Sequence, residues 1–423
     1  MRVVGCLLGL SACTLWGELS PPENIEPRPT AGQDSAESDL ELPEEPKERP
    51  PETEALLRWP YLQEVDSDGL SVIVGVSDEG QQVEVELARD DDRWTVEAEG
   101  DILAGVTPTM RLLRARFDGL EAGTTYSYRV MVDGVEVIGG FSAMTRPADE
   151  AAPVRFLVLG DFGSGRQAQR DLRDVMLQHL DGVQFWLTTG DNAYYGGTAQ
   201  SFQDNVFKVY QEILAEVPML PTPGNHDYQS YDLQPYLDSF FLPEQGPDAW
   251  SHERFWRVDW GPLRLFGLDS VDSMFKLTRE PGDDQLDWIE EQDALPGPPW
   301  KLAAFHYPAY SAQPNRTPDY LVKLHLEPLL EALAFPLVLT GHNHMYERFV
   351  PIREGKADPT GITWIVSGGG GQGLYPTGKD PLHAYVEEAY HFMIFDVDAC
   401  TLQGRAIDIK GDVIDDWTQS ICP

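Results

Sequence analysis

The chain has 423 residues, of which 42% are hydrophobic, so it is long enough for two domains and too apolar for global disorder. Its formal net charge is −39 at pH 7, and acidic residues are spread along the whole sequence. Such a surface repels polyanions, so we set nucleic acid aside as a partner, and a phosphate-bearing substrate would need local positive charge such as metal ions supply.

Residues 1–13 have the form of an export signal, in which Arg2 precedes the apolar run Val3–Leu10. That run is too short to serve as a permanent membrane span. The tetrapeptide Leu10-Ser11-Ala12-Cys13 resembles the lipobox of bacterial lipoproteins, in which the cysteine is lipidated. The alternative is an ordinary secretory signal in which Cys13 is incidental. We therefore expect an exported lipoprotein of a bacterial cell envelope that meets the membrane only through this anchor, with secretion as the alternative.

Residues 14–56 are dominated by Pro, Glu, Asp and Ser. This composition has too little apolar surface to offset the entropy lost on ordering. We predict an acidic, Pro-rich disordered tether, which proline stiffens and charge repulsion extends.

Residues 57–147 carry short strand patterns separated by turns. The runs Leu70–Val76 and Gln82–Leu87 alternate in polarity, and Asp133-Gly134 forms a hairpin signal between two later runs. The size and rhythm are typical of an immunoglobulin-like or fibronectin-type β-sandwich, and the segment Leu120–Val130 resembles the fibronectin-type strand entry. No candidate chemistry lies in this part.

From residue 153 to residue 423, apolar strand runs alternate with helical patterns, which predicts a layered α/β domain. The expected helices are Arg166–Leu180, Ser201–Ala215, Asp284–Asp293 and Tyr320–Leu333. The strands that precede polar motifs are expected at Val154–Leu159, Phe185–Thr189, Met219–Pro223, Leu302–Phe305 and Leu337–Thr340.

Each of these five strands ends in a potential metal ligand. The residues are Asp161, Asp191, Asn225, His306, and His342 with His344. Because ligands bind at the carboxyl ends of strands in such sheets, we expect these groups to meet. Asp191 can offer one carboxylate oxygen to each of two cations, and Tyr194 can reach one of them as a phenolate. A mixture of hard oxygen ligands and imidazoles suits iron, manganese or zinc better than calcium or magnesium.

Each motif alone has another interpretation. Asp161 and Asp191 could lie in ordinary turns, Asn225 could cap a helix, and His306 could be a core histidine. The glycine-rich run Gly368–Gly373 could cradle phosphate, or could be a turn packed beneath the metal-bearing loops.

Together the motifs resemble the calcineurin-like metallophosphoesterases, and within them the purple acid phosphatases. The features that select the purple branch are Gly160-Asp161-Phe162-Gly163 and Tyr194. The resemblance implies a layered α/β/β/α sandwich preceded by the all-β sandwich. It also implies hydrolysis of small phosphate monoesters by a hydroxide that two metal ions activate. The alternatives are a phosphodiesterase or nucleotidase with the same metals, or a non-catalytic surface lipoprotein.

The resemblance also assigns roles, beginning with the two metal ions. Its ferric-iron ligands would be Asp161, Asp191, Tyr194 and His344. The ligands of a divalent zinc, iron or manganese ion would be Asp191, Asn225, His306 and His342.

On the substrate side, the resemblance implies that Asn225 and His226 bind the phosphate and that His226 can protonate the leaving group. Plant members carry a histidine pair where this chain has Asn315-Arg316. Arg316 is either a phosphate clamp or an ordinary loop residue.

The chain contains four cysteines. If Cys6 is removed with the signal and Cys13 is lipidated, Cys400 and Cys422 remain as the only possible disulfide pair in the exported protein.

Overall fold

The structure is a computed structural model that describes residues 55–77, 80–271 and 284–422. The predicted signal with Cys13, and nearly all of the predicted tether, lie outside the described residues. Within these ranges no helix is long and apolar enough to cross a membrane.

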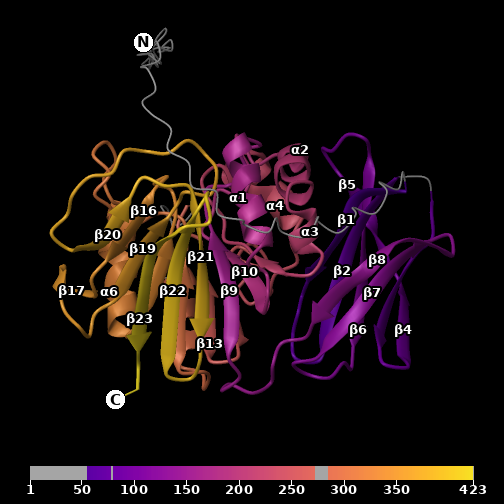
Figure 1. Ribbon diagram of the computed structural model, residues 1–423, viewed down its shortest axis with the longest axis horizontal. Helices are drawn as coiled ribbons and strands as arrows, with labels where there is room; N and C mark the ends of the chain where they lie inside the picture. The colour runs from indigo at the N-terminus through magenta and orange to yellow at the C-terminus, as the bar shows by residue number, and fades with distance from the viewer. Residues whose placement is uncertain (1–54, 78–79, 272–283, 423) are drawn as a thin grey trace, which may run out of the picture. The chain divides into compact units, whose positions relative to one another are not determined.

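The N-terminal part of the described chain is a sandwich of two antiparallel sheets (Figure 1). Their strand orders are β1-β2-β6-β5 and β4-β3-β7-β8. The strands are β1 Leu56–Gln63, β2 Gly69–Ser77, β3 Val83–Arg89, β4 Asp92–Glu97, β5 Glu99–Leu103, β6 Met110–Asp118, β7 Thr125–Val132 and β8 Val135–Met144. An all-β N-terminal sandwich is therefore confirmed, while its fibronectin-type assignment stays a prediction.

The hairpin turn predicted in the sandwich is confirmed. The hairpin between β7 and β8 turns at Asp133 and Gly134, whose φ angles of 50° and 76° suit the twist of the flanking strands. The sandwich also contacts the next domain directly, because the hydroxyl of Tyr128 donates to the carbonyl of Ala215 at 2.6 Å.

The first sheet of the α/β domain has the strand order β11-β10-β9-β21-β22-β23. Its parallel part is β9 Val154–Leu159, β10 Val183–Thr188 and β11 Met219–Leu220. Antiparallel strands extend it, namely β21 His391–Val397, β22 Thr401–Asp408 and β23 Val413–Ser420.

The second sheet has the order β12-β13-β14-β15-β19-β16-β20. Its strands are β12 Trp256–Trp260, β13 Leu263–Gly267, β14 Trp300–Ala304, β15 Leu337–Thr340, β16 Tyr346–Phe349, β19 Thr363–Ser367 and β20 His383–Glu387. The strands from β13 through β14 and β15 to β19 are parallel. A small ribbon of β17 Ile352–Arg353 and β18 Lys356–Ala357 lies apart.

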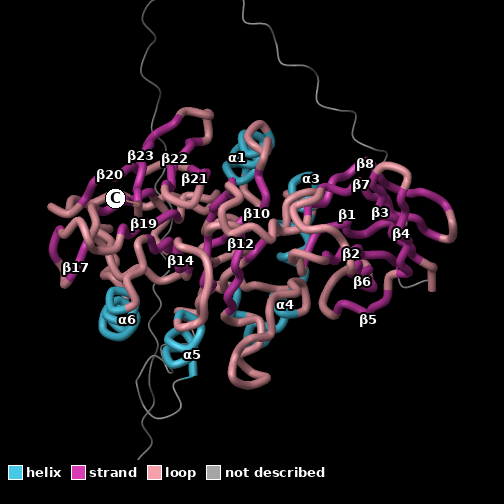
Figure 2. Tube along the Cα trace, turned by 90° about the horizontal axis from the view of Figure 1, so that it is seen from below, coloured by secondary structure: helices cyan, strands magenta, loops and turns pink. Residues whose placement is uncertain are grey.

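Alternation along β14 explains how the two sheets form layers. Leu302 and Ala304 belong to the large core cluster shared with the first sheet, whereas Ala303 belongs to a second cluster with Leu286 of α5 and Leu329 of α6. Figure 2 shows α1 on one side of the strands and α5 and α6 on the opposite side. The predicted α/β/β/α fold class is confirmed.

Helices are the part of the fold that departs most from the sequence prediction. The helices of the α/β domain are α1 Gln167–Leu177, α2 Ala199–Phe202, α3 Gln211–Leu214, α4 Gln234–Leu237, α5 Asp284–Asp293 and α6 Glu327–Ala332. The single helix expected over Ser201–Ala215 is wrong, because the π-helical turn Gln203–Phe207 separates α2 from α3. A second π-helical segment, Val322–Leu326, precedes α6.

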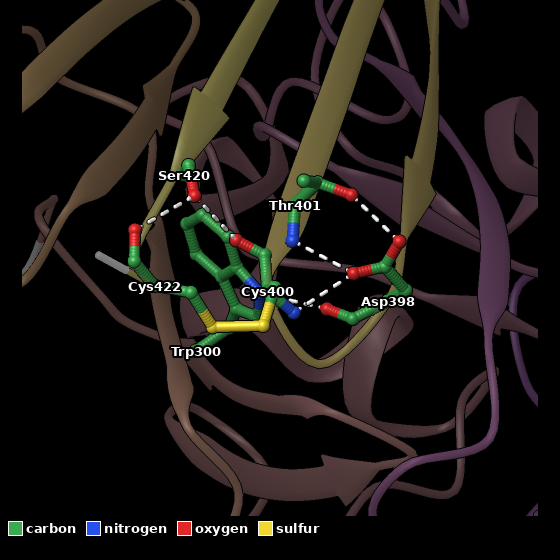
Figure 3. The surroundings of a disulfide bond; sticks show 6 residues. All are labelled: Trp300, Asp398, Cys400, Thr401, Ser420 and Cys422. Carbon is green, nitrogen blue, oxygen red and sulfur yellow. Dashed lines mark hydrogen bonds between the residues drawn. A yellow bond between two sulfur atoms is a disulfide. The ribbon is translucent and has the colours of Figure 1, made fainter.

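A disulfide joins Cys400 to Cys422 beside the end of β23 (Figure 3). The hydroxyl of Ser420 donates to the carbonyl of Cys400 at 3.2 Å, and the N–H of Ile421 donates to the same carbonyl at 3.0 Å. The disulfide therefore fastens the C-terminal segment to the turn that precedes β22.

Candidate metal centre

The polar motifs lie at the carboxyl ends of strands from both sheets. Asp161, Asp191 and Asn225 follow β9, β10 and β11 of the first sheet, while His306 and His342 follow β14 and β15 of the second. The structure brings the predicted ligands together at this edge.

Left-handed backbone aims three of these side chains inward. Asp161, Asp191 and His342 have φ angles of 56°, 50° and 68°, a region that costs L-residues energy and is common at functional sites. Each follows a glycine. At Gly190, itself at φ 88°, an added Cβ would lie 2.6 Å from Nδ1 of His306, so a side chain there would displace that imidazole.

The first group of side chains surrounds the hydroxyl of Tyr194. That oxygen lies 2.9 Å from Oδ2 of Asp191, 3.1 Å from Oδ1 of Asp161 and 3.2 Å from Nε2 of His344. All four side chains are buried. Two carboxylates, a phenol and an imidazole thus converge on one point.

The second group surrounds the side-chain oxygen of Asn225. Nε2 of His306 and Nδ1 of His342 each lie 3.0 Å from this oxygen, and 3.2 Å from each other. Oδ2 of Asp191 lies 3.4 Å from the same Nε2 of His306. Asp191 is therefore common to both groups, and ligand atoms of Asp161, Asp191 and His306 all lie within 4.8 Å of one another.

The donor set fits metal ions. Nδ1 of His306 bonds the carbonyl of Thr189 at 2.9 Å, and Nδ1 of His344 bonds the carbonyl of Gly373 at 2.7 Å. These bonds fix the outer N–H of each ring, as is usual for metal-binding histidines. Each Nε2 then points inward toward oxygen atoms of Tyr194, Asp161, Asp191 or Asn225, an arrangement that a bound cation would satisfy.

The pKa shifts in the second group also indicate a site for a cation. Burial opposes ionisation of Asp191, but the positive charges of His306 and His226 outweigh it and hold the pKa of that carboxyl below its usual range. Burial also lowers the pKa of His306, yet Asp191 outweighs burial and raises it to about 9. Burial and the neighbouring charges of His306 and Arg316 lower the pKa of His342 to about 2. The place between Asp191 and His306 thus attracts a positive charge.

Half-exposed residues border the open side of this centre. The backbone N–H of His226 donates to Oδ1 of Asp191 at 2.7 Å, and its ring centroid lies 4.4 Å from that of Tyr194. Arg316 adds a guanidinium group to this border. Its Nη1 lies 2.9 Å from Nε2 of His342, and its Nη2 donates to the Tyr375 hydroxyl at 2.8 Å. Both predicted substrate-side residues therefore lie beside the ligands.

Asp227 is a site residue that the motif reading missed. Its buried carboxylate accepts the backbone N–H groups of Asn192, Ala193 and Gly224, at 2.8 to 3.1 Å, and also the side-chain amide of Asn192 at 2.8 Å. It thereby ties the loop of Asp191 to the loop of Asn225. Its position beside Asn225 and His226 is the only sequence signal that could have identified it.

Tyr375 was also missed. Its ring stacks on His344, with centroids 4.1 Å apart and an interplanar angle of 14°, while its hydroxyl accepts from Arg316. The loop of Arg316 is itself held by buried Glu347, which accepts from the Ser311 hydroxyl at 2.6 Å and from the Ala312 N–H at 2.8 Å. These contacts join residues far apart in the sequence, so no local sequence pattern predicts them.

The glycine-rich run packs against the metal-bearing loops. An added Cβ at Gly368 would lie 2.3 Å from the carbonyl of Asn343 and 2.9 Å from Oδ2 of Asp161. The N–H of Gly370 donates to the carbonyl of Gly160 at 3.0 Å. This agrees with the tight-turn interpretation.

Part of the sequence matches a known protein family. Residues 154–346 match the family model of the calcineurin-like phosphoesterases. Residues 154–346 therefore form a calcineurin-like phosphoesterase domain.

Individual relatives are purple acid phosphatases. Purple acid phosphatase 21 of Arabidopsis thaliana is 27% identical over 286 residues, which cover 64% of this chain and 62% of that protein. Human tartrate-resistant acid phosphatase type 5 is 25% identical over 256 residues, covering 53% of this chain and 75% of that protein. The structure of a purple acid phosphatase from yellow lupin seeds has the same fold, with a TM-score of 0.73 and 17% identity over 85% of this chain and 74% of that one. The present chain thus spans less than two thirds of the Arabidopsis relative.

Proposed function

We propose that this protein is a binuclear-metal phosphatase that hydrolyses small phosphate monoesters. The observation that carries the proposal is the carboxylate of Asp191, which lies within both groups of ligand atoms. The first metal ion, ferric iron, is held by Asp161, Asp191, Tyr194 and His344. The second, a divalent zinc, iron or manganese ion, is held by Asp191, Asn225, His306 and His342.

When bound, two such ions neutralise the charge of the phosphate and acidify the water that attacks it. This positive charge also overcomes the repulsion between an anionic substrate and a chain of net charge −39.

His226 supplies the proton to the leaving group. The side-chain amide nitrogen of Gln229 lies 3.0 Å from Nδ1 of His226, and this contact orients the ring. The side chain of His226 is 26% exposed, and its Nε2 lies 4.0 Å from Asp191. It is thus open to a substrate while it adjoins the metal ligands, as a general acid must be.

Arg316 and Asn225 bind the phosphate oxygens. The planar guanidinium of Arg316 is well suited to two parallel hydrogen bonds to phosphate. Its contacts with His342 and the Tyr375 hydroxyl hold it at the border of the ligand group. An arginine here also favours monoesters, because a monoester presents more unsubstituted oxygens and more negative charge than a diester.

The decisive experiment combines metal analysis with a substrate panel. Purified wild-type protein is expected to hold two metal ions per chain and to hydrolyse p-nitrophenyl phosphate faster than bis(p-nitrophenyl) phosphate. Asp191→Asn is expected to lose both metal ions and activity, whereas the exposed Asp149→Asn keeps both. A faster reaction with the diester would favour the phosphodiesterase alternative. Bound metal without turnover of any ester would favour a non-catalytic surface protein.

Export with lipid anchoring is a separate part of the proposal, and it rests on the lipobox-like tetrapeptide ending at Cys13. In a Gram-negative host, wild-type protein is expected to fractionate with membranes and to incorporate labelled fatty acid. Cys13→Ser is expected to abolish the labelling. Unchanged labelling of the variant would contradict the anchor.

A further inference from the structure

Tyr195 is an exposed aromatic residue next to the candidate metal centre. Its side chain is 61% exposed, although it directly follows the buried ligand residue Tyr194. The centroid of its ring lies 6.3 Å from that of His226, with the two rings nearly perpendicular at 74°. A large ring surface is therefore open to solvent beside the proposed general acid.

Hydrogen bonds hold both the hydroxyl of Tyr195 and the backbone that precedes this residue. The Tyr195 hydroxyl accepts from Nη2 of Arg166 at 2.7 Å. At the backbone end, the side-chain amide of Asn205 donates to the carbonyl of Tyr194 at 3.2 Å, in the peptide group that joins the two tyrosines. An exposed tyrosine fixed in this way has already lost rotamer freedom, so stacking on it costs little further entropy.

The proposed reaction indicates which part of the substrate would lie beside the Tyr195 ring. If His226 protonates the ester oxygen, that oxygen lies within hydrogen-bond distance of its imidazole. The substituent carried by that oxygen then lies beside His226. The Tyr195 ring, whose centroid is 6.3 Å from that of His226, is within reach of this substituent. A flat substituent can stack on this ring, whereas a short alkyl chain gains little there.

We propose that Tyr195 is a specificity-determining residue that stacks on the aromatic leaving group of the substrate. The inference rests on the proposed phosphatase function and adds its substrate class, phosphate esters of aromatic alcohols or nucleosides.

The test compares three substrates of the metal-loaded protein: phenyl phosphate, adenosine 5′-monophosphate and glycerol 1-phosphate. Each variant is compared with wild type on the same substrate, so that differences in leaving-group acidity cancel. Because the ring supplies the stacking surface, Tyr195→Ala is expected to lower kcat/KM for an aromatic ester about 5- to 150-fold more than for the glycerol ester. The loss is expected mainly in KM.

Two further variants separate stacking from structural damage. Tyr195→Phe keeps the ring and is expected to keep most of the preference for aromatic esters, although it loses the bond from Arg166. Val135→Ala, which changes a residue of the sandwich that is 65% exposed, is expected to match wild type on all three substrates.

The outcomes distinguish this inference from the proposed function. A selective loss with phenyl phosphate assigns an aryl leaving group, and a selective loss with the nucleotide assigns a nucleobase. Equal losses on all three substrates, or no loss in Tyr195→Ala, would overturn the stacking role and leave the phosphatase intact. A wild-type protein that hydrolyses none of them would overturn the proposed function and this inference together.

Discussion

Asp227 offers a direct test of how the two metal-bearing loops are held together. Its carboxylate is the acceptor for four buried donors, which belong to Asn192, Ala193 and Gly224. Asp227→Ala leaves these donors without that acceptor. At roughly 1 kcal/mol or more for each unsatisfied group, the free energy of unfolding is expected to fall by about 4 kcal/mol. Asp227→Asn keeps the shape and one acceptor oxygen, so about half that loss is expected.

Urea unfolding of the metal-stripped protein measures this effect, because bound metal would add its own stabilisation. Burial, together with the charge of Asp191, raises the pKa of Asp227 to about 7, so the measurement is made at pH 8, where the carboxylate is ionised. The exposed Asp91→Ala is the matched control and is expected to stay within about 0.5 kcal/mol of wild type.

The same variants should reveal the link to function, because the loops that Asp227 joins carry Asp191 and Asn225. Asp227→Ala is therefore expected to bind metal more weakly as well as to unfold more easily. If it unfolded within 1 kcal/mol of wild type, these hydrogen bonds would not be what holds the loops. If it were destabilised but bound metal with unchanged affinity, the positioning role would be refuted.

Three further outcomes are expected. The disulfide between Cys400 and Cys422 spans a sequence separation of 22, so its removal by Cys400→Ser with Cys422→Ser should cost roughly 3 kcal/mol in urea unfolding; an unchanged midpoint contradicts this. Burial lowers the pKa of His391 to about 4, below the unfolded value, so the unfolded state takes up the proton first. Stability is thus expected to fall by up to roughly 3 kcal/mol as pH drops from about 6.5 to 4, and His391→Gln should flatten that dependence. Tyr194→Phe should abolish the visible charge-transfer band expected of the oxidised, iron-loaded wild type; a band that persists would exclude Tyr194 as the phenolate ligand.

The parallel strands could be predicted closely because their signals are local. The structure places β9 at Val154–Leu159 and β15 at Leu337–Thr340, the same ranges as the sequence prediction. Both are apolar runs buried on two faces, and each is followed by a glycine and a polar residue, Gly-Asp after β9 and Gly-His after β15. The strands β10, β11 and β14 end earlier than predicted, at Thr188, Leu220 and Ala304, but the polar motifs still follow them at the same edge. The order of strands and motifs, together with the family resemblance, was therefore enough to predict the ligand group.

The helical region after Tyr194 could not be predicted, because distant contacts shape it. The side chain of Gln203 accepts from Nε of Arg58 at 2.7 Å and donates to the carbonyl of Leu57 at 2.7 Å, and both partners lie in β1 of the sandwich. These bonds span more than 140 residues of sequence. The π-helical turn begins at Gln203, and helical periodicity alone does not show that its side chain is committed elsewhere.

Arg316 illustrates where sequence reading ends and structure adds information. From the sequence it was either a phosphate clamp or a solvated loop residue, since nothing nearby fixes its direction. The structure ties its loop to the buried carboxylate of Glu347, which also bonds Nε2 of His383 at 3.0 Å. A loop residue without such support would gain little by binding phosphate, because ordering it would cost much of the energy. The support comes from β16 and β20, two strands that the sequence prediction did not include, so the role of Arg316 could be argued only after those strands were in place.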